Sequence, residues 1–314
     1  MTRASLHAVV AALGGDLYDG GRRASVPAPG HSAADRSVSL LLAEERVIAH
    51  GFGDADWRAA LAELRRRGLI DAGGRLTGPG GAPPGGAGAP VAPSRSAAVR
   101  RAAAAVLWSQ AAPITATTVS ARHLELRAVP DAAASAALRH HPAAPLSAYR
   151  PGRAVRPALL ARIDDPQGRL AGVEVTYLDP SGRRAATLGL SRKTVGTAPA
   201  GSAVRLAPPG EVLLVGEGVF SVLSAAARLE LPGWALRSAS LLPRWSPPPG
   251  VRRVVIAADR GRPGERAALA LADRLSAGGV GSDIVPPPPP WADWNEAHLA
   301  TASREVEEGR SGRR

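Results

Sequence analysis

Two short apolar runs, each closed by an acid, constrain the fold of this chain more than any other feature. They are VLLVGEG at positions 212–218 and VVIAAD at positions 254–259. Unbroken apolar runs of this length are typical of strands buried on both faces, as in a parallel sheet covered by helices. In open α/β sheets ligands bind outside the carboxyl ends of the strands. We therefore expect Glu217 and Asp259 to lie side by side at a ligand crevice.

The residues around these runs alternate between strand and helix patterns. Strands are predicted at 212–217, 234–236, 254–259 and 282–285, with helices at 219–229 and 264–277. Such alternation implies a parallel sheet with right-handed crossovers. The proline run at 286–290 cannot extend a sheet, and we interpret it as a stiff spacer that delivers residues 291–295. The sequence thus predicts an α/β domain at 207–305, followed by a disordered tail at 306–314.

Three further segments are predicted upstream of this domain. Residues 1–71 form a small α+β module, with helices at 6–13 and 56–68 and paired strands at 37–42 and 46–49. Residues 72–96 are rich in Gly, Pro and Ala and are expected to be a flexible linker. Residues 97–206 begin with helices at 97–110 and 119–126 and continue as a β-rich meander.

Composition limits the classes of function. The chain has no cysteine, which excludes disulfides, thiolate zinc sites and cysteine nucleophiles. No export signal or long apolar span is present, so we expect a cytoplasmic protein without a membrane partner. The formal net charge is +12, which favours a polyanionic partner, although biased codon usage accounts for part of the arginine content. Lys193 and Asn295 are the only lysine and the only asparagine, and they stand out against that bias.

Both acids have a structural interpretation beside the chemical one. Glu217 and Asp259 each precede a predicted helix, where an acid can serve as a cap. The same position places a carboxylate beside a helix amino terminus that attracts phosphate. Asp293 and Glu296 fit a capping box, while Asp293 and Asn295 are also candidates to complete the acidic crevice. No P-loop, His-Glu-x-x-His or Gly-x-Ser-x-Gly motif occurs, so a motor ATPase, a zinc protease and a serine hydrolase are not indicated.

Several segments together resemble one known family. GEGVFSVLSAA, WALRSASLL, VVIAADRGRPGERAALALADRL and ADWNEA are similar to the Toprim domain of bacterial primases, topoisomerases and related nucleases. The resemblance is to the version attached to phage and plasmid primase-like proteins of DNA replication, and GVEVTYLDPSGRRAATL and RKTVG resemble the region that precedes Toprim there. Within residues 1–71, VPAPGHSAADRSVSLLL and IAHGFGDADWRAALAELRRRGLI resemble the amino-terminal zinc-ribbon domain of primases in a degenerate form. Only His31 and His50 remain near ligand positions there, so we predict no zinc.

The resemblance implies roles for particular residues. Glu217 matches the acid/base residue, and Asp259 matches the first member of an Asp-x-Asp pair that binds Mg²⁺ or Mn²⁺. The second member is replaced by Gly261, a change that weakens such a site unless Asp293 and Asn295 compensate. The candidate nucleic-acid contacts are Lys193, Arg192, Arg260 and Arg36.

Three functional hypotheses follow. The first is a primase-like enzyme that acts on single-stranded DNA by nucleotidyl transfer or phosphodiester cleavage, with cleavage the lesser expectation and with a separate helicase as partner. The second is a catalytically inactive Toprim-fold protein that binds nucleic acid, which Gly261 favours. The third is a binder of small nucleotides in the same crevice.

Overall fold

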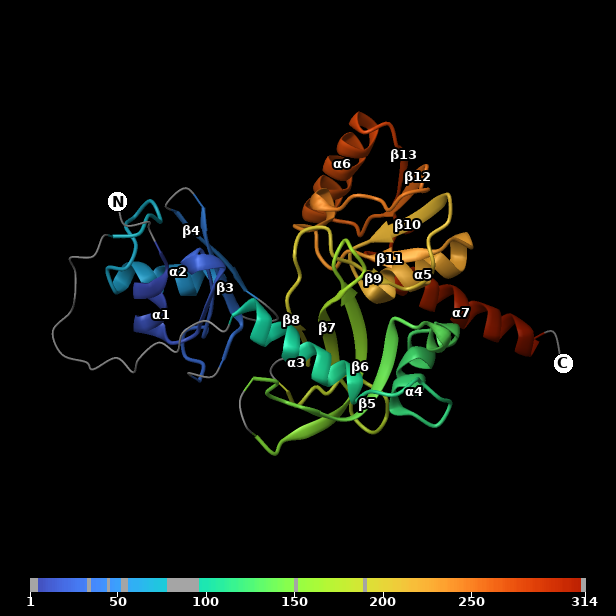
Figure 1. The fold of residues 1–314 in the computed structure, drawn as a ribbon, viewed down its shortest axis with the longest axis horizontal. Helices are drawn as coiled ribbons and strands as arrows, with labels where there is room; N and C mark the ends of the chain where they lie inside the picture. Colours follow the sequence, from blue (N-terminus) through green and yellow to red (C-terminus); the bar gives the residue numbers. More distant parts are fainter. Residues whose placement is uncertain are drawn as a thin grey trace. The chain divides into compact units, whose positions relative to one another are not determined.

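The chain folds into two compact units, Met1–Arg95 and Ser96–Arg314. The computed structural model describes residues 5–32, 35–43, 46–51, 56–77, 96–149, 152–188 and 191–311 (Figure 1). Most of the linker expected at 72–96 lies outside these residues. No helix among them is both long and apolar enough to cross a membrane.

The first unit is built around a four-stranded antiparallel sheet. Its elements are α1 (His7–Leu13), β1 (Asp16–Tyr18), the 3-10 turn η1 (Asp19–Gly21), β2 (Arg23–Val26), β3 (Val38–Ala43), β4 (Arg46–Gly51) and α2 (Trp57–Arg66). The strands follow one another in the order β1-β2-β3-β4. Alternate residues of β3, such as Val38 and Leu40, point into the core of this unit. The same core contains Leu6, which directly precedes α1, and Leu64 of α2. Asp56 caps α2 by accepting a hydrogen bond from the Arg58 N–H at 2.8 Å.

The second unit begins with a helical segment and a second antiparallel sheet. Its elements are α3 (Ala97–Ser109), α4 (Val119–Leu126), η2 (Pro130–Ala134), β5 (Leu138–Pro145), β6 (Val155–Asp164), β7 (Leu170–Tyr177) and β8 (Arg192–Gly196), and the strand order is β5-β6-β7-β8. Successive residues of β6 serve opposite faces. Leu160 packs against the core beneath α3, whereas Leu159 and Ala161 join the core that includes α4.

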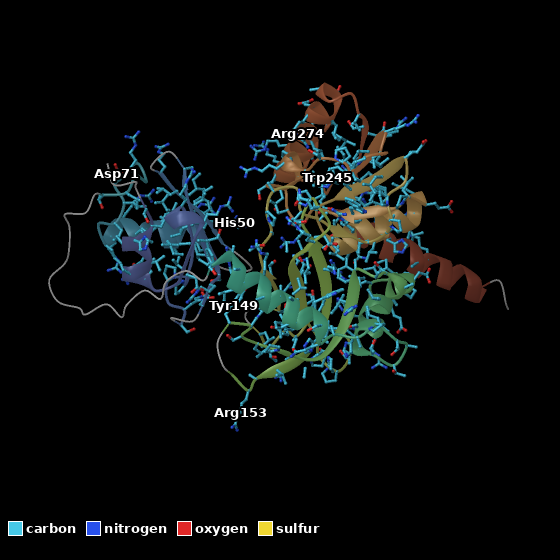
Figure 2. All side chains as sticks on the ribbon, in the orientation of Figure 1. His50, Asp71, Tyr149, Arg153, Trp245 and Arg274 are labelled. Atoms are coloured by element: carbon cyan, nitrogen blue, oxygen red, sulfur yellow. The ribbon has the colours of Figure 1, made fainter. Side chains whose placement is uncertain are left out.

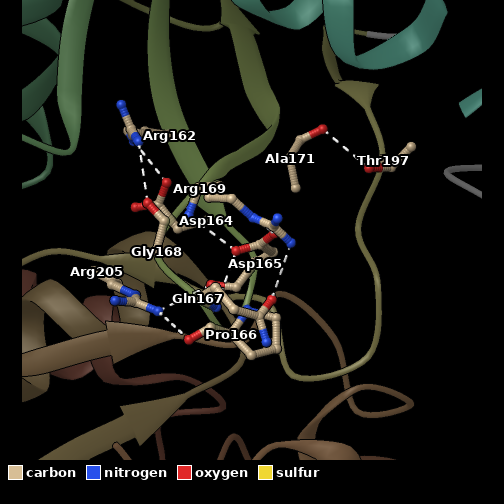
Figure 3. A network of polar contacts seen from close by, with 10 residues as sticks. All are labelled: Arg162, Asp164, Asp165, Pro166, Gln167, Gly168, Arg169, Ala171, Thr197 and Arg205. Atoms are coloured by element: carbon tan, nitrogen blue, oxygen red, sulfur yellow. Dashed lines mark hydrogen bonds and ion pairs between the residues drawn. The ribbon is translucent and has the colours of Figure 1, made fainter. Parts of the chain in front are cut away.

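A polar network closes the hairpin between β6 and β7 (Figure 3). The Asp165 carboxylate accepts hydrogen bonds from the backbone N–H groups of Gln167 and Arg169 and from the Arg169 Nε. Arg205 donates to the carbonyls of Asp165 and Pro166 at 2.9 and 3.1 Å. Because Arg205 belongs to β9 (Val204–Arg205), these bonds tie the hairpin to the next sheet.

The last part of the chain is a five-stranded, mostly parallel sheet. Its elements are β10 (Val212–Gly216), α5 (Val219–Leu229), β11 (Gly233–Ala235), η3 (Leu242–Arg244), β12 (Arg253–Ala257), α6 (Arg262–Ala277), β13 (Gly281–Val285) and α7 (Trp294–Ser311). The order is β13-β12-β10-β11-β9, with β9 antiparallel at one edge. Leu214 and Val255 face the core that contains α5 and the start of α7, whereas Leu213 and Val254 face α6.

The predicted fold class is confirmed by this parallel sheet with helices on both faces. Trp245, labelled in Figure 2, is 1% exposed and meets Trp234 edge to face at 6.2 Å in the core beneath α6. Helix α7 continues to Ser311, so helix covers much of the stretch 306–314 that the sequence suggested as a disordered tail.

Candidate active site

The two acids predicted to meet do lie at the same edge of the parallel sheet. β10 and β12 pair in parallel with Gly216 opposite Ala257, so Glu217 and Asp259 follow neighbouring strand ends. A Cβ at Gly216 would lie 2.8 Å from the Ala257 carbonyl oxygen, which explains why glycine precedes the acid. Both acids line one cavity of about 220 Å³.

Glu217 is held in an environment that favours its protonated form. Burial, and secondarily the charge of Asp259, raises the pKa of Glu217, while a hydrogen bond from the Ala239 backbone N–H acts in the opposite direction. A Cβ at Gly264 would lie 3.2 Å from Glu217 Oε1, so glycine there lets α6 begin close to the carboxylate. A carboxyl with a raised pKa is suited to proton transfer near neutral pH.

Asp259 is fixed by a hydroxyl and is surrounded by other acids. The Ser221 hydroxyl donates to Asp259 Oδ1 at 2.6 Å. Burial raises the pKa of Asp259, the Ser221 hydrogen bond lowers it, and the charges of Asp293 and Glu296 raise it further. No positively charged side chain is among the groups that shift its pKa, so a bound cation would stabilise the Asp259 carboxylate.

The start of α7 supplies the remaining predicted residues. Asp293 Oδ1 accepts a hydrogen bond from the Glu296 N–H at 2.9 Å, and Glu296 Oε2 accepts one from the Ala292 N–H at 2.9 Å. This arrangement is a variant of the capping box. Asp293 also lines the cavity, so the capping role and the site role coexist. Asn295 lines the cavity as well and is only 3% exposed.

Three arginines face these acids across the cavity. Arg127 follows α4, Arg192 opens β8 and Arg237 follows β11, and Glu174 of β7 lies among them. Burial lowers the pKa of Arg127 and of Arg237, the charges of Asp293 and Glu174 respectively act in the opposite direction, and the charge of Arg192 lowers both. Within the part of the chain that the structure describes, none of the three forms a salt bridge. Guanidinium groups that repel one another and form no salt bridge with the nearby carboxylates favour an anionic ligand.

Arg237 occupies a conformation that arginine rarely adopts. Its φ is 76°, in the left-handed region, and its backbone N–H donates to the Glu217 carbonyl at 2.7 Å. Its guanidinium donates to the Thr194 hydroxyl of β8, while its buried Nε has no hydrogen-bond partner. Strain of this kind costs about 1–3 kcal/mol and concentrates at functional sites.

The predicted nucleic-acid contacts other than Arg192 do not line this cavity. Lys193 and Arg192 are neighbours on β8 and therefore point to opposite faces of the sheet. Lys193 faces the α3 side, where its Nζ donates to the Leu146 carbonyl at 2.6 Å and lies 5.0 Å from the Tyr177 ring. Arg260 donates twice to the Pro287 carbonyl, at 3.0 and 2.8 Å. Arg36, in the first unit, pairs with Asp16 at 2.9 Å.

The acids suit a divalent cation that keeps part of its own hydration. Glu217, Asp259 and Asp293 offer carboxylate oxygens, the donors that Mg²⁺ prefers, and burial together with neighbouring carboxylate charge raises the pKa of the first two. Among the described residues, no three His, Cys, Asp or Glu side chains are arranged to hold a metal by themselves. The donor set therefore fits Mg²⁺ bound through one or two carboxylates, water and phosphate, rather than a closed protein cage.

Sequence reasoning missed four polar residues of this cavity: Glu174, Arg127, Arg237 and Ser221. Arg237 could have been found, because it follows a short strand predicted in the same parallel sheet and so emerges at the same edge. Ser221 lies four residues after Glu217, one helical turn into α5. No sequence signal marks Arg127 or Glu174, since their position depends on how the antiparallel sheet packs on the parallel one.

Comparison with known families identifies part of the chain. Residues 212–304 match the model of the Toprim domain, and residues 98–206 match the model of a domain of unknown function, DUF7146. The carboxyl-terminal part of the protein is therefore a Toprim domain, as the sequence motifs predicted. A search of curated protein sequences finds no match.

Similar folds occur among solved structures of primases. The catalytic core of the E. coli primase is 15% identical, with a TM-score of 0.45 over 68% of this chain and 78% of that one. The zinc-binding and RNA polymerase domains of the Aquifex aeolicus primase are 15% identical, with a TM-score of 0.43 over 98% and 82% of the two chains. The primase fragment of the bacteriophage T7 primase-helicase is 18% identical, with a TM-score of 0.41 over 59% and 72%.

Proposed function

We propose that this protein is a primase-like enzyme that joins nucleotides on single-stranded DNA by Mg²⁺-dependent nucleotidyl transfer. The observation that carries the proposal is one cavity in which Glu217 and Asp259 face Arg127, Arg192 and Arg237. Acids beside guanidinium groups that form no salt bridge among the described residues suit a reaction at a nucleotide phosphate, where negative charge must be bound and a proton must move.

Each residue has a distinct task in this proposal. The arginines bind phosphate oxygens and orient a nucleoside triphosphate. Glu217 in its carboxylate form, made more basic by the burial that raises its pKa, accepts the proton of the attacking hydroxyl. The hydroxyl oxygen bonds to the α-phosphorus while the bond to the leaving pyrophosphate breaks. Asp259, oriented by Ser221, would hold Mg²⁺ together with Asp293. When bound, Mg²⁺ supplies charge neutralisation at the reacting phosphate. Arg192 is the predicted nucleic-acid contact that lines the cavity, and it remains one in the proposal.

The main alternative is a protein that binds nucleic acid without turnover. Gly261 favours it, because the family pattern has a second metal-binding Asp at that position. A separate helicase remains the proposed partner, since this sequence has no P-loop whereas the T7 relative is a primase-helicase. Phosphodiester cleavage is the second possible reaction of the same groups.

Primer synthesis and nicking assays on single-stranded DNA, with Mg²⁺ or Mn²⁺, test the proposal. We expect wild-type protein to make short products and Glu217→Gln to lose about 10²–10⁴-fold in rate. Glu211→Gln is the matched control, because Glu211 precedes β10 at its opposite end and its side chain is 74% exposed. Salt-dependent DNA binding without either activity in the wild type would refute the enzyme and support the binding protein.

A further inference from the structure

Two consecutive backbone carbonyls at the end of α4 are held by side chains of α7. Asn295 Nδ2 donates to the Arg127 carbonyl at 2.8 Å, and His298 Nε2 hydrogen-bonds the Ala128 carbonyl at 2.8 Å. A carbonyl only accepts, so Nε2 of His298 carries the proton in this contact. The last carbonyls of a helix have no partner within the helix and need one from outside. Here the Toprim domain supplies both partners to the preceding domain.

The end of α4 is an unusual helix terminus. The Ala128 N–H bonds to the Glu125 carbonyl and the Val129 N–H to the Leu124 carbonyl, which is the Schellman pattern. The residue at its left-handed position is normally glycine, yet here Ala128 has a φ of 56°. An alanine in this conformation persists only when the surrounding contacts hold it. Asn295 and His298 are the side chains of α7 that contact this turn.

The same segment places Arg127 at the cavity. Its guanidinium carbon lies 4.8 Å from the centre of the Phe220 ring, and Phe220 is the second residue of α5 and lines the cavity. The Arg127 Nε is buried without a hydrogen-bond partner. The backbone of Arg127 is thus fixed by α7 and its side chain is directed by α5, both of which belong to the Toprim domain.

We propose that Asn295 and His298 are positioning residues that hold Arg127 for phosphate binding. The Asn295 amide nitrogen donates to the Arg127 carbonyl and to Ser224 Oγ at 2.9 Å, which fixes the side chain on both, whereas its Oδ1 is buried without a hydrogen-bond partner. The inference rests on the proposed function, since it assumes that Arg127 binds the nucleotide phosphates.

A double-mutant cycle on the full chain tests the inference, with Mg²⁺–ATP as the probe in equilibrium binding. We expect Arg127→Ala and Asn295→Ala each to weaken ATP binding about tenfold, a coupling of the size found between residues in contact. The double variant should bind no more weakly than Arg127→Ala alone. A purely structural role for Asn295 predicts instead that the two effects multiply.

The histidine gives an independent test by rescue. His298→Gln keeps an N–H donor for the Ala128 carbonyl and should retain ATP affinity, whereas His298→Leu should lose about threefold to tenfold. If Asn295→Ala does not fold, the comparison of His298→Gln with His298→Leu tests the inference by itself. Equal affinities for the Gln and Leu variants would overturn the inference.

The outcomes also separate the inference from the proposed function. If Arg127→Ala binds ATP as tightly as wild type, the proposed phosphate role of the arginines fails and the inference fails with it. If Arg127→Ala binds weakly while Asn295→Ala is unaffected or its effect multiplies with that of Arg127→Ala, the proposed function stands and the positioning role is refuted.

Discussion

Replacing Gly261 with aspartate tests whether the missing carboxylate of the Toprim pattern belongs at this position. Gly261 has a φ of 115°, and a Cβ built there would have nothing within 4 Å. The cost of Gly261→Asp is therefore backbone strain without a steric clash, about 1–3 kcal/mol. Gly261 also precedes α6, but its φ of 115° and ψ of 149° lie outside the β region in which an N-cap side chain works, so no capping gain offsets the strain. We expect a destabilisation of about 1–2 kcal/mol, within that range.

The size of the thermal effect follows from the size of the unit. The second unit, Ser96–Arg314, has a length at which 1 kcal/mol lowers the melting temperature by about 2–4 °C. Gly261→Asp should therefore melt roughly 2–8 °C below wild type without divalent ions. A second carboxylate two residues from Asp259 should strengthen Mg²⁺ binding, and a tenfold gain in affinity adds about 1.4 kcal/mol at saturating Mg²⁺. Much of the loss should then be recovered.

Thermal unfolding with and without MgCl₂ measures both effects. Gly250→Asp is the matched control, because Gly250 has a φ of 92°, also has nothing within 4 Å of a built Cβ, and precedes β12 at the end away from Asp259. It should lose stability to a similar extent and gain nothing from Mg²⁺. If Gly261→Asp responds to Mg²⁺ no more than Gly250→Asp does, the assignment of Gly261 to the second carboxylate position is refuted.

Three further predictions concern neighbouring residues and the core. Arg192→Gln should reduce the slope of log binding constant against log salt concentration for single-stranded DNA by about one. Lys193→Gln should leave this slope unchanged, because the two side chains lie on opposite faces of β8. Equal slopes for the two variants would contradict this placement. Burial lowers the pKa of Lys193 to about 8 from its ordinary 10.5. Between pH 8 and 10.5 Lys193 binds a proton in the unfolded chain more fully than in the folded one, so the free energy of unfolding of wild type should rise with pH relative to that of Lys193→Met. Chemical denaturation at several pH values measures this, and the same pH dependence of the unfolding free energy in both proteins would refute it. Trp245→Ala should cost about 3–5 kcal/mol in the same measurement, since the side chain is 1% exposed; a cost below about 1 kcal/mol would contradict its place in the core.

The parallel sheet and its pair of acids were predictable because they depend on local pattern. The runs that became β10 and β12 are apolar throughout, and parallel strands bring their carboxyl ends to one edge whatever the rest of the chain does. Glu217 and Asp259 therefore meet as expected. The capping box of Asp293 and Glu296 is equally local, since it involves residues three apart.

Other features depend on long-range packing and left no readable signal. β5 was missed because its sequence, LRHHPAAP, contains two prolines and no clear alternation, which a strand tolerates only at the edge of a sheet. Lys193 was interpreted as a nucleic-acid contact because it is the only lysine, but the face of β8 to which it belongs is set by register. Arg127 reaches the cavity only because α4 packs against the Toprim domain.

The central claim is that Asp259 still binds a divalent ion although Gly261 replaces its usual partner. Titration of the full chain with Mn²⁺, monitored by electron paramagnetic resonance of the free ion, tests this directly. We predict one site in wild type that Asp259→Asn weakens at least tenfold, because Mg²⁺-type sites rely on one or two carboxylates. Asp283→Asn is the control and should leave Mn²⁺ binding unchanged, since Asp283 lies on β13 and forms an ion pair with Arg253 of β12 at 2.6 Å. Equal Mn²⁺ binding by wild type and Asp259→Asn would contradict the account.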